Sequence, residues 1–562
     1  MSWRIPSLLL LFAATLNADT RGPRDADFAS WGGDTYPRQP AVDALHYVFR
    51  LGLTDRSSEI TGETTITVKF LRDGVADLNL DLTSLSVATG MTVQSVRRGS
   101  PIDVPGPASD NIAFGHLNNR LHLVLPPQSQ AGQELTFTIR YRGTPAAGLR
   151  IGPNMHGERT FFGENWPNLV RNWLPMIDHP YDKATGEFIV TAPNHYQVVA
   201  NGVLVEEVDL PDNQRRTHWK QSVPIASWLY TVAVARFSSH HAGVIGGVPV
   251  QTWVFPQDRE AGQHLFEDLS RRALQFFAAN IGPYPYEKLA NVQATGFTGG
   301  TEYASAIFYG EKGVSAGRGP VVHEIAHQWF GNSVTEKDWD DVWLSEGFAT
   351  YFALLFTEHD EGRDAFAEGL KRSRDQVLQL EQKLPNTPIV HRNLDDMNKV
   401  LNNLVYQKGG WVLHMLRQEV GTEHFWTAIR EYYRRYRDRN ASTADLRAVF
   451  EQVSGKQLDW FFAQWLNRAG VPKIEGSWRY NAARKELELM LNQTQTSEPY
   501  RVNIDVGVVL RAGELPVIKT LAIAHPFKQG TFTFPLEAAP VSVVLDPNTT
   551  LLVDAGALIK RQ

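Results

Sequence analysis

The 562-residue sequence contains no cysteine. This absence excludes disulfide frameworks, thiolate zinc fingers, iron–sulfur ligation and a cysteine nucleophile. Any metal ion must therefore be held by histidine, aspartate or glutamate side chains. No stretch is apolar over the roughly 20 residues that a membrane-spanning helix needs, so we expect no transmembrane segment.

A surplus of positive charge is missing as well. The 55 basic and 61 acidic residues give a formal net charge of −6, so no bulk basic field attracts nucleic acid. Hydrophobic residues make up 43% and charged residues 21%, which is ordinary for globular proteins and excludes wholesale disorder. A chain of this length is expected to fold as about three or four domains.

Residues 1–18 resemble an export signal. Arg4 supplies a short positive region, residues 5–16 form an apolar stretch rich in leucine, and Ala18 suits the position before a cleavage site. The alternative is a buried N-terminal strand or helix. We predict an exported, soluble protein of the periplasm or the extracellular space.

Hydrophobic spacing divides the rest of the chain into three parts. Residues 41–237 show period-two alternation, which predicts mostly antiparallel sheet. One such strand has apolar residues at alternate positions: Leu135, Phe137, Ile139 and Tyr141. Residues 474–562 return to period two, as at Leu487, Leu489 and Leu491, and predict a small β-sandwich.

Between them, residues 238–470 show helical spacing. Leu265, Leu269, Ala273 and Phe277 fall on one face of a helix that we expect to end near residue 280. A later helix has Thr443 as its expected N-cap and Gly455 as its expected C-terminal stop.

The pattern His-Glu-x-x-His occurs once, at His323, Glu324 and His327. Histidines four apart lie one helical turn apart on the same face, so both imidazoles can bind one zinc ion. The carboxylate of Glu324 can then reach a metal-bound water. The alternative is a helix whose histidines pack in a core, but the pattern is expected by chance only about 0.03 times in such a chain.

A catalytic zinc ion needs a third protein ligand. Eighteen residues separate His327 from Glu346, which lies in a second helical stretch at residues 343–352. A connection of this length can return that helix to the first one. The metzincin pattern fails, because Phe330 and Ser333 stand where it requires glycine and histidine. We therefore predict one zinc ion per chain, bound by His323, His327 and Glu346.

Residues 323–332 and 343–349 resemble the zinc motif of the gluzincin aminopeptidases, of the aminopeptidase N, alanyl aminopeptidase and leukotriene hydrolase type. Residues 171–180 resemble a stretch of that family's N-terminal domain. The resemblance runs from about residue 41 to the C-terminus. It implies a multidomain α+β fold: a β-saddle domain (41–237), a thermolysin-like catalytic domain (238–470) and a β-sandwich (474–562). The long helical C-terminal domain of many relatives has no room.

The resemblance also implies further site residues. Tyr406 matches the tyrosine that stabilises the tetrahedral intermediate, the alternative being a packed tyrosine on a helix surface. Gly299, Gly300 and Glu302 match a Gly-x-Met-Glu-Asn loop that lines the substrate and binds its free amine. The alternative for Glu302 is an exposed glutamate in a loop.

Three positions depart from the family's pattern. Thr301 and Tyr303 replace the methionine and the asparagine of the amine-binding loop. A second acidic amine-binding position falls at Trp166, with Glu164 nearby as a candidate.

These residues predict a zinc-dependent aminopeptidase that removes N-terminal residues from peptides by attack of metal-activated water. Glu324 is the expected general base, and zinc and Tyr406 are expected to hold the developing oxyanion. The substrates are peptides with a free N-terminus, and no nucleic acid is involved. Two alternatives remain: a secreted zinc endopeptidase on the same core, and a non-catalytic peptide-binding relative.

Overall fold

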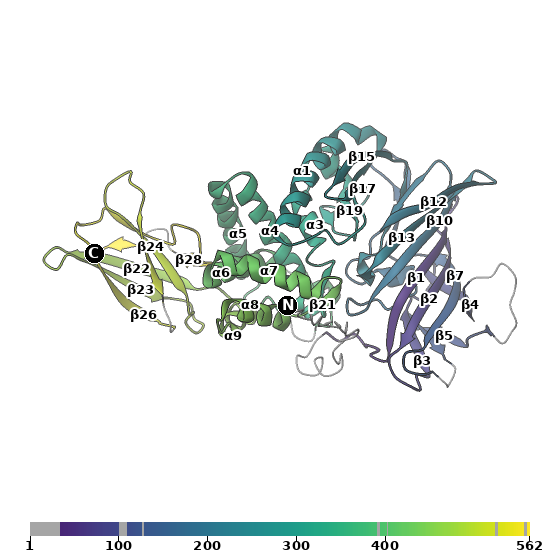
Figure 1. The fold of residues 1–562 in the computed structure, drawn as a ribbon, viewed down its shortest axis with the longest axis horizontal. Coiled ribbons are helices and arrows are strands. Elements are labelled where there is room, and N and C mark those ends of the chain that lie inside the picture. The colour runs from purple at the N-terminus through teal and green to yellow at the C-terminus, as the bar shows by residue number, and fades with distance from the viewer. Residues whose placement is uncertain are drawn as a thin grey trace, which may run out of the picture.

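The computed structural model describes residues 34–100, 110–125, 129–390, 394–401, 403–522, 526–555 and 559–562. The predicted signal peptide at residues 1–18 lies outside these ranges. Three regions follow one another along the long axis of the molecule (Figure 1). Strands dominate the first region and the last, and most helices lie between them, so the predicted mixed α+β fold with a β-rich N-terminal part is confirmed.

A seven-stranded sheet forms most of the N-terminal region, in the order β12-β13-β10-β1-β2-β7-β4. Its neighbours are antiparallel except β1 and β10, which run parallel. The predicted alternation holds in β7, where Phe137, Ile139 and Tyr141 are buried. The strands are β1 (Val42–Gly52), β2 (Ile60–Phe70), β4 (Gly90–Arg98), β7 (Glu134–Thr144), β10 (Lys183–Pro193), β12 (Val203–Leu210) and β13 (Gln214–Ala226).

Two smaller sheets complete this region. One has the order β3-β6-β5 and the other β11-β14-β9-β8. Their strands are β3 (Asp77–Asp81), β5 (Phe114–Leu117), β6 (Arg120–Val124), β8 (Leu149–Pro153), β9 (Arg159–Gly163), β11 (Gln197–Ala200) and β14 (Val232–Ala235). The end of β9 leads into the segment that carries Glu164 and Trp166, which places both residues beside the central region.

The central region begins with a five-stranded sheet that the helical spacing did not predict, in the order β15-β16-β17-β19-β18. Every residue of β17 and β19 is buried, so these strands lack the alternation that marks a half-exposed strand. The strands are β15 (Ser238–Ile245), β16 (Val248–Val254), β17 (Leu289–Ala294), β18 (Gly300–Thr301) and β19 (Ala306–Gly310). The edge strand β18 begins the segment that holds Glu302.

Helices pack beside this sheet and below it in Figure 1. The first of them ends at Asn280, as predicted. The helices are α1 (Arg259–Asn280), α2 (Glu311–Ser315), α3 (Val321–His327), α4 (Trp343–Asp360), α5 (Arg363–Lys383), α6 (Asn403–Val420), α7 (Thr422–Tyr436), α8 (Thr443–Ser454) and α9 (Asp459–Leu466). A short parallel pair, β20 (Val334–Glu336) and β21 (Arg439–Ala441), links the loop after α3 to the loop after α7.

One helix boundary differs from the prediction. The N-cap of α8 is Ser442, not Thr443, because the Ser442 hydroxyl and the Asp445 carboxylate each bond the other residue's backbone N–H. The hydroxyl of Thr443 instead donates a hydrogen bond of 2.6 Å to Asp341. The predicted stop at Gly455 is confirmed, since this residue has a positive φ of 69°.

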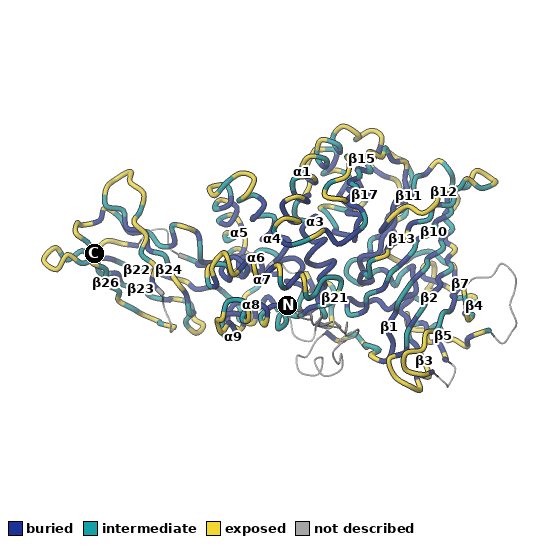
Figure 2. Tube along the Cα trace, viewed as in Figure 1, coloured by how far each residue is buried: buried dark blue, intermediate teal, exposed yellow. Residues whose placement is uncertain are grey.

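The C-terminal region consists of short strands in two sheets. The order is β26-β23-β22-β28 in one sheet, in which β29 also pairs with β22, and β25-β24-β27 in the other. The strands are β22 (Lys473–Asn481), β23 (Glu486–Gln493), β24 (Asn503–Val509), β25 (Val517–Ala522), β26 (Gln529–Pro535), β27 (Ser542–Leu545), β28 (Asp554–Ala555) and β29 (Lys560–Arg561). Figure 2 shows exposed turns at the ends of these strands and buried chain through the central region.

Candidate metal centre and cleft

Helix α3 presents two histidines on one face. His323 and His327 are one turn apart, and their Nε2 atoms lie 3.1 Å from each other. His327 is fully buried, whereas the side chain of His323 is 19% exposed. The first histidine therefore faces a cleft and the second faces the interior.

Helix α4 brings a carboxylate to the same point. One oxygen of Glu346, Oε2, lies 3.5 Å from Nε2 of His323 and 3.3 Å from Nε2 of His327. This oxygen is buried and accepts no hydrogen bond from the described residues. The predicted set of two histidines and one glutamate thus converges from two helices.

The three facing atoms fit a metal ion. Zinc binds nitrogen and oxygen at about 2.0–2.2 Å, and tetrahedral angles then separate two ligand atoms by about 3.4 Å. The observed separations of 3.1, 3.3 and 3.5 Å form such a triangle. Burial alone would raise the pKa of Glu346, but the charge of His327 and the close approach of both imidazole rings lower it to about 2. The carboxylate is therefore ionised, as a metal ligand must be.

Close packing of two glycines fixes the position of α4 against α6. A Cβ atom on Gly347 would lie only 2.9 Å from the backbone carbon of Gly409. Because neither residue has a side chain, the two helices approach closely, and the neighbouring residues Glu346 and Tyr406 reach the same cleft.

Ser345 was missed by the sequence analysis. Its hydroxyl lies 3.0 Å from Nδ1 of His327, and the carbonyl oxygen of Phe330 lies 3.3 Å from the same nitrogen. Such contacts orient the ring so that Nε2 faces the ligand site. A serine before the glutamate carries no distinctive spacing, so only the tertiary contact identifies it.

Glu324 lies beside the ligand triangle, not in it. Its side chain is buried and lies so near Gly300 that a Cβ atom there would be 2.4 Å from the carboxyl carbon. Burial raises its pKa well above the usual range, and the charges of Glu302 and Glu346 add to this effect. The glycine of β18 thus makes room for the predicted general base.

Glu302 is buried near the second histidine. Its Oε1 atom lies 3.8 Å from Nδ1 of His327 and accepts no hydrogen bond from the described residues. Its backbone oxygen is held by the side-chain amides of Gln328, at 2.9 Å, and Asn332. Burial raises the pKa of this carboxyl to about 7, against the opposing charge of His327. The alternative of an exposed loop glutamate is therefore wrong.

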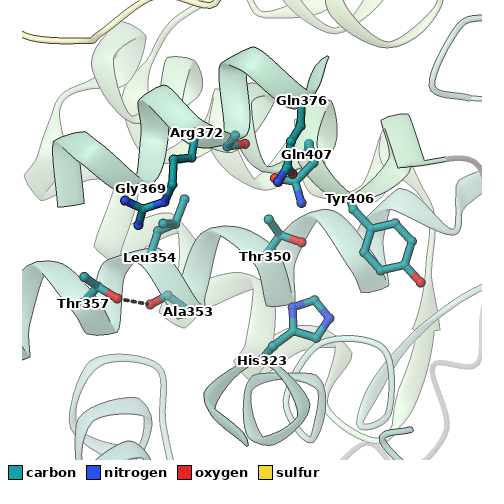
Figure 3. A pocket seen from close by; sticks show the side chains of 11 residues that line it. His323, Thr350, Ala353, Leu354, Thr357, Gly369, Arg372, Gln376, Tyr406 and Gln407 are labelled. Carbon is teal, nitrogen blue, oxygen red and sulfur yellow. Dashed lines mark hydrogen bonds between the residues drawn. The ribbon is translucent and has the colours of Figure 1, made fainter. Parts of the chain in front are cut away.

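Tyr406 in α6 lies next to His323, whereas Glu302 lies near His327. Its ring stacks on His323 with 6.2 Å between ring centroids, and it borders a cavity of about 320 Å³ (Figure 3). Burial raises the pKa of this phenol above its usual range, and the carboxylates of Glu346 and Glu302 add to the shift. The hydroxyl is therefore a proton donor at neutral pH.

Glu164 forms an ion pair with Arg150 and, within the described residues, does not contact the ligand triangle. Its carboxylate binds Arg150, with Oε1 accepting from Nη2 at 2.7 Å. The neighbouring backbone N–H of Asn165 donates to the hydroxyl of Tyr303 at 3.0 Å. Tyr303, one of the departures from the family's pattern, thus ties the N-terminal region to the segment that carries Glu302.

No helix within the described ranges combines the length and apolar character needed to cross a membrane.

Comparisons with known proteins agree with this arrangement. The Peptidase M1 N-terminal domain model matches residues 43–229, and the Peptidase family M1 domain model matches residues 268–465. The glutamyl aminopeptidases of Homo sapiens and Bos taurus are similar to the chain, at 29% and 28% identity over 65% and 59% of its length. The chain covers only 40% and 36% of these two relatives.

Solved structures with a similar fold include M1 zinc metallopeptidases. That of Deinococcus radiodurans has a TM-score of 0.64 at 23% identity, covering 79% of this chain and 96% of that one. A mutant of it bound to a Tyr-Ser-Ala substrate gives 0.66 at 25% identity, covering 78% and 98%. Aminopeptidase A of Legionella pneumophila gives 0.76 at 17% identity, covering 93% and 60%.

The ligand triangle and these neighbours together support one zinc ion as the cofactor. Two models of one family match successive parts of the chain, and the segments that they match contain the residues of the cleft. The chain therefore belongs to peptidase family M1.

Proposed function

We propose that this chain is a zinc-dependent aminopeptidase that removes N-terminal residues from peptides. The observation that carries the proposal is the buried, unpartnered carboxylate oxygen of Glu302, 3.8 Å from His327. A carboxylate in such a place can bind the α-ammonium group of a peptide through charge-assisted hydrogen bonds. It then fixes the distance between the N-terminus and the ligand site.

In this proposal His323, His327 and Glu346 hold the zinc ion. When bound there, zinc lowers the pKa of water towards about 7 and polarises the substrate carbonyl. Ser345 keeps His327 in the required orientation through the 3.0 Å contact with its Nδ1 atom.

Glu324 is the proposed general base. Its carboxylate accepts a proton from the attacking water and later donates it to the leaving amine. It must be ionised for this role, which a positive charge at the neighbouring ligand site favours. Burial beside Gly300 keeps bulk water away from the carboxylate.

Tyr406 donates its hydroxyl hydrogen to the carbonyl oxygen as that oxygen gains negative charge. Gly299 and Gly300 let the peptide backbone approach β18 closely, since neither has a side chain. Glu164 stays a prediction as a substrate-binding residue, because its ion pair with Arg150 must open before it can bind an amine.

We also propose the domain boundaries 41–237, 238–470 and 474–562. The first would be a β-saddle, the second a thermolysin-like catalytic domain and the third a β-sandwich, which the two C-terminal sheets support. Residues 1–18 would direct export to the periplasm or the extracellular space.

The test uses the zinc-loaded chain and one peptide in two forms, with a free and with an acetylated N-terminus. We expect release of single N-terminal residues from the free form only. The variant Glu302→Gln should retain zinc but lose affinity for the free form. Equal cleavage of both forms by the wild type would support a secreted zinc endopeptidase, and binding without cleavage would support a non-catalytic relative.

A further inference from the structure

The cavity beside His323 and Tyr406 is lined mostly by side chains that have no role in the proposed reaction. It lies between α4, α5 and α6 and has a volume of about 320 Å³, near the lower end of small-ligand pockets (about 300–1,000 Å³). The eleven residues that line it are His323, Thr350, Ala353, Leu354, Thr357, Gly369, Arg372, Ser373, Gln376, Tyr406 and Gln407. None of these eleven is acidic, so the cavity favours an anionic group.

The cavity and the amine-binding carboxylate lie on different sides of the ligand triangle. Glu302 contacts His327, whereas the cavity opens at His323 and under the ring of Tyr406. A peptide with its ammonium group at Glu302 and its first carbonyl at the triangle continues past His323. The part of the peptide after the scissile bond therefore enters the cavity.

Arg372 supplies the positive charge of the cavity. Figure 3 shows its guanidinium reaching from α5 toward Gly369 and Leu354. A Cβ atom on Gly369 would lie 2.6 Å from Cδ2 of Leu354 and 3.9 Å from Nη2 of Arg372, so both side chains lie over this glycine.

Arg372 is exposed to solvent, and its guanidinium forms no hydrogen bond or ion pair with another described residue. Glu368, one turn earlier, binds Lys371 at 2.7 Å. The pKa of Glu368 is lowered mainly by that hydrogen bond and by the charge of Lys371, and least by the charge of Arg372. A planar guanidinium in this state is suited to bind a carboxylate through two parallel hydrogen bonds.

We infer that Arg372 binds a carboxylate on the residue that follows the scissile bond. This inference rests on the proposed aminopeptidase function and gives it a substrate class. The carboxylate has two sources: the free C-terminus of a dipeptide, or an acidic side chain at the second residue of a longer peptide. The first source would make the enzyme favour the shortest peptides.

The experiment compares three peptides on the zinc-loaded enzyme: X-Ala with a free C-terminus, X-Ala-amide and X-Glu-amide. Here X is the residue released fastest from a panel of aminoacyl substrates. We expect kcat/KM to be about tenfold higher for a peptide with a carboxylate than for X-Ala-amide, as for a partly exposed charged hydrogen bond. Preference for X-Ala alone identifies the C-terminal carboxylate, and preference for X-Glu-amide alone identifies the side chain. Equal preference for both shows that Arg372 accepts either carboxylate.

Two variants on the same helix sharpen this test. Arg372→Gln should abolish the preference while cleaving X-Ala-amide as the wild type does. Lys371→Gln removes a neighbouring charge that does not line the cavity, and it should keep the preference. Wild-type enzyme that treats all three peptides alike would overturn the inference. So would an Arg372→Gln variant that changes only the choice of X, since the cavity would then hold the N-terminal side chain.

A binding measurement separates the inference from the proposed function. Calorimetry on zinc-loaded Glu324→Gln should show about tenfold tighter binding of X-Ala, of X-Glu-amide or of both than of X-Ala-amide, and the added Arg372→Gln change should remove the difference. If no peptide is cleaved by the wild type, the aminopeptidase proposal fails, but this measurement still decides whether Arg372 binds a carboxylate. Equal binding of X-Ala, X-Glu-amide and X-Ala-amide would overturn the inference alone.

Discussion

The buried lysines that join the regions differ in their hydrogen bonding from the carboxylates that are buried around α3. Lys408 donates to Glu381 at 2.8 Å and to the carbonyl oxygen of Gly470 at 2.9 Å. Lys288 donates to the carbonyl oxygen of Ala200 at 2.7 Å and lies over the ring of Trp219. Both lysines thus join segments that are distant in sequence, and each has its acceptors inside the protein.

The carboxylates around α3 have no such partners. One oxygen of Glu302 and one of Glu346 are buried without a hydrogen-bond donor among the described residues. A buried acceptor left in this state destabilises a fold by about 1–3 kcal/mol. The difference agrees with a structural role for the lysines and with the ligand-binding roles proposed above for the carboxylates.

The largest effect is expected from removing a ligand of the triangle. In His323→Ala, the two atoms that remain cannot hold zinc firmly, so metal content should fall from about one ion per chain to near zero. Peptide hydrolysis should fall to background with it. Elemental analysis after gel filtration measures the metal. The control His240→Ala removes a histidine of β15 that is paired with Glu267 of α1. Full zinc occupancy in His323→Ala would disprove the ligand set.

The next effect separates chemistry from metal binding. Glu324→Gln keeps the shape of the side chain but cannot accept the water proton, so we expect kcat to fall by about 10²–10⁴. Zinc content and melting temperature should stay close to those of the wild type. Loss of zinc together with activity would show that Glu324 is a ligand and not a base.

Much of this centre could be predicted from the sequence because it depends on local geometry. The spacing of His323 and His327 on one helical turn and the return of α4 with Glu346 follow from periodicity and connection length. Ser345 and Arg372 could not be predicted, because each becomes informative only through a neighbour far away in the chain. Strands β17 and β19 were missed because every residue in them is buried, so they do not alternate. The N-cap of α8 was misplaced by one residue because two hydroxyl residues stand side by side.

The third prediction tests a buried lysine that we consider structural. Lys408→Met leaves the carboxylate of Glu381 beside an apolar side chain, and breaking a buried pair in this way destabilises proteins by about 3–5 kcal/mol. Urea unfolding of the zinc-loaded enzyme measures the loss. Below the unfolding transition, kcat/KM should match the wild type, because Lys408 does not line the cleft. A large loss of activity in the folded variant would place Lys408 with the site.

The smallest effect is expected at Glu336. This buried carboxyl fits neither the lysines that have partners nor the carboxylates assigned to ligands. Its side chain is 1% exposed, and neither carboxylate oxygen has a hydrogen-bond partner among the described residues, yet it is not part of the ligand triangle. Burial raises its pKa from 4.5 to about 8. The carboxyl is therefore mostly protonated at pH 7 in the folded chain and ionised in the unfolded chain.

Because the folded state binds the extra proton between these two pKa values, stability must decrease as the pH rises from about 4.5 to about 8. The variant Glu336→Gln has no proton to lose, so its melting temperature should fall less than that of the wild type between pH 5 and pH 8, with the difference largest near pH 8. Near pH 5 the two proteins should agree within about 1 kcal/mol, because a neutral carboxyl and an amide have similar size and polarity. Peptide hydrolysis at pH 7 should be nearly unchanged, in contrast to Glu324→Gln. A loss of zinc or of turnover in Glu336→Gln would show that this carboxyl acts with the metal site and that unpartnered acids in this region have one shared role.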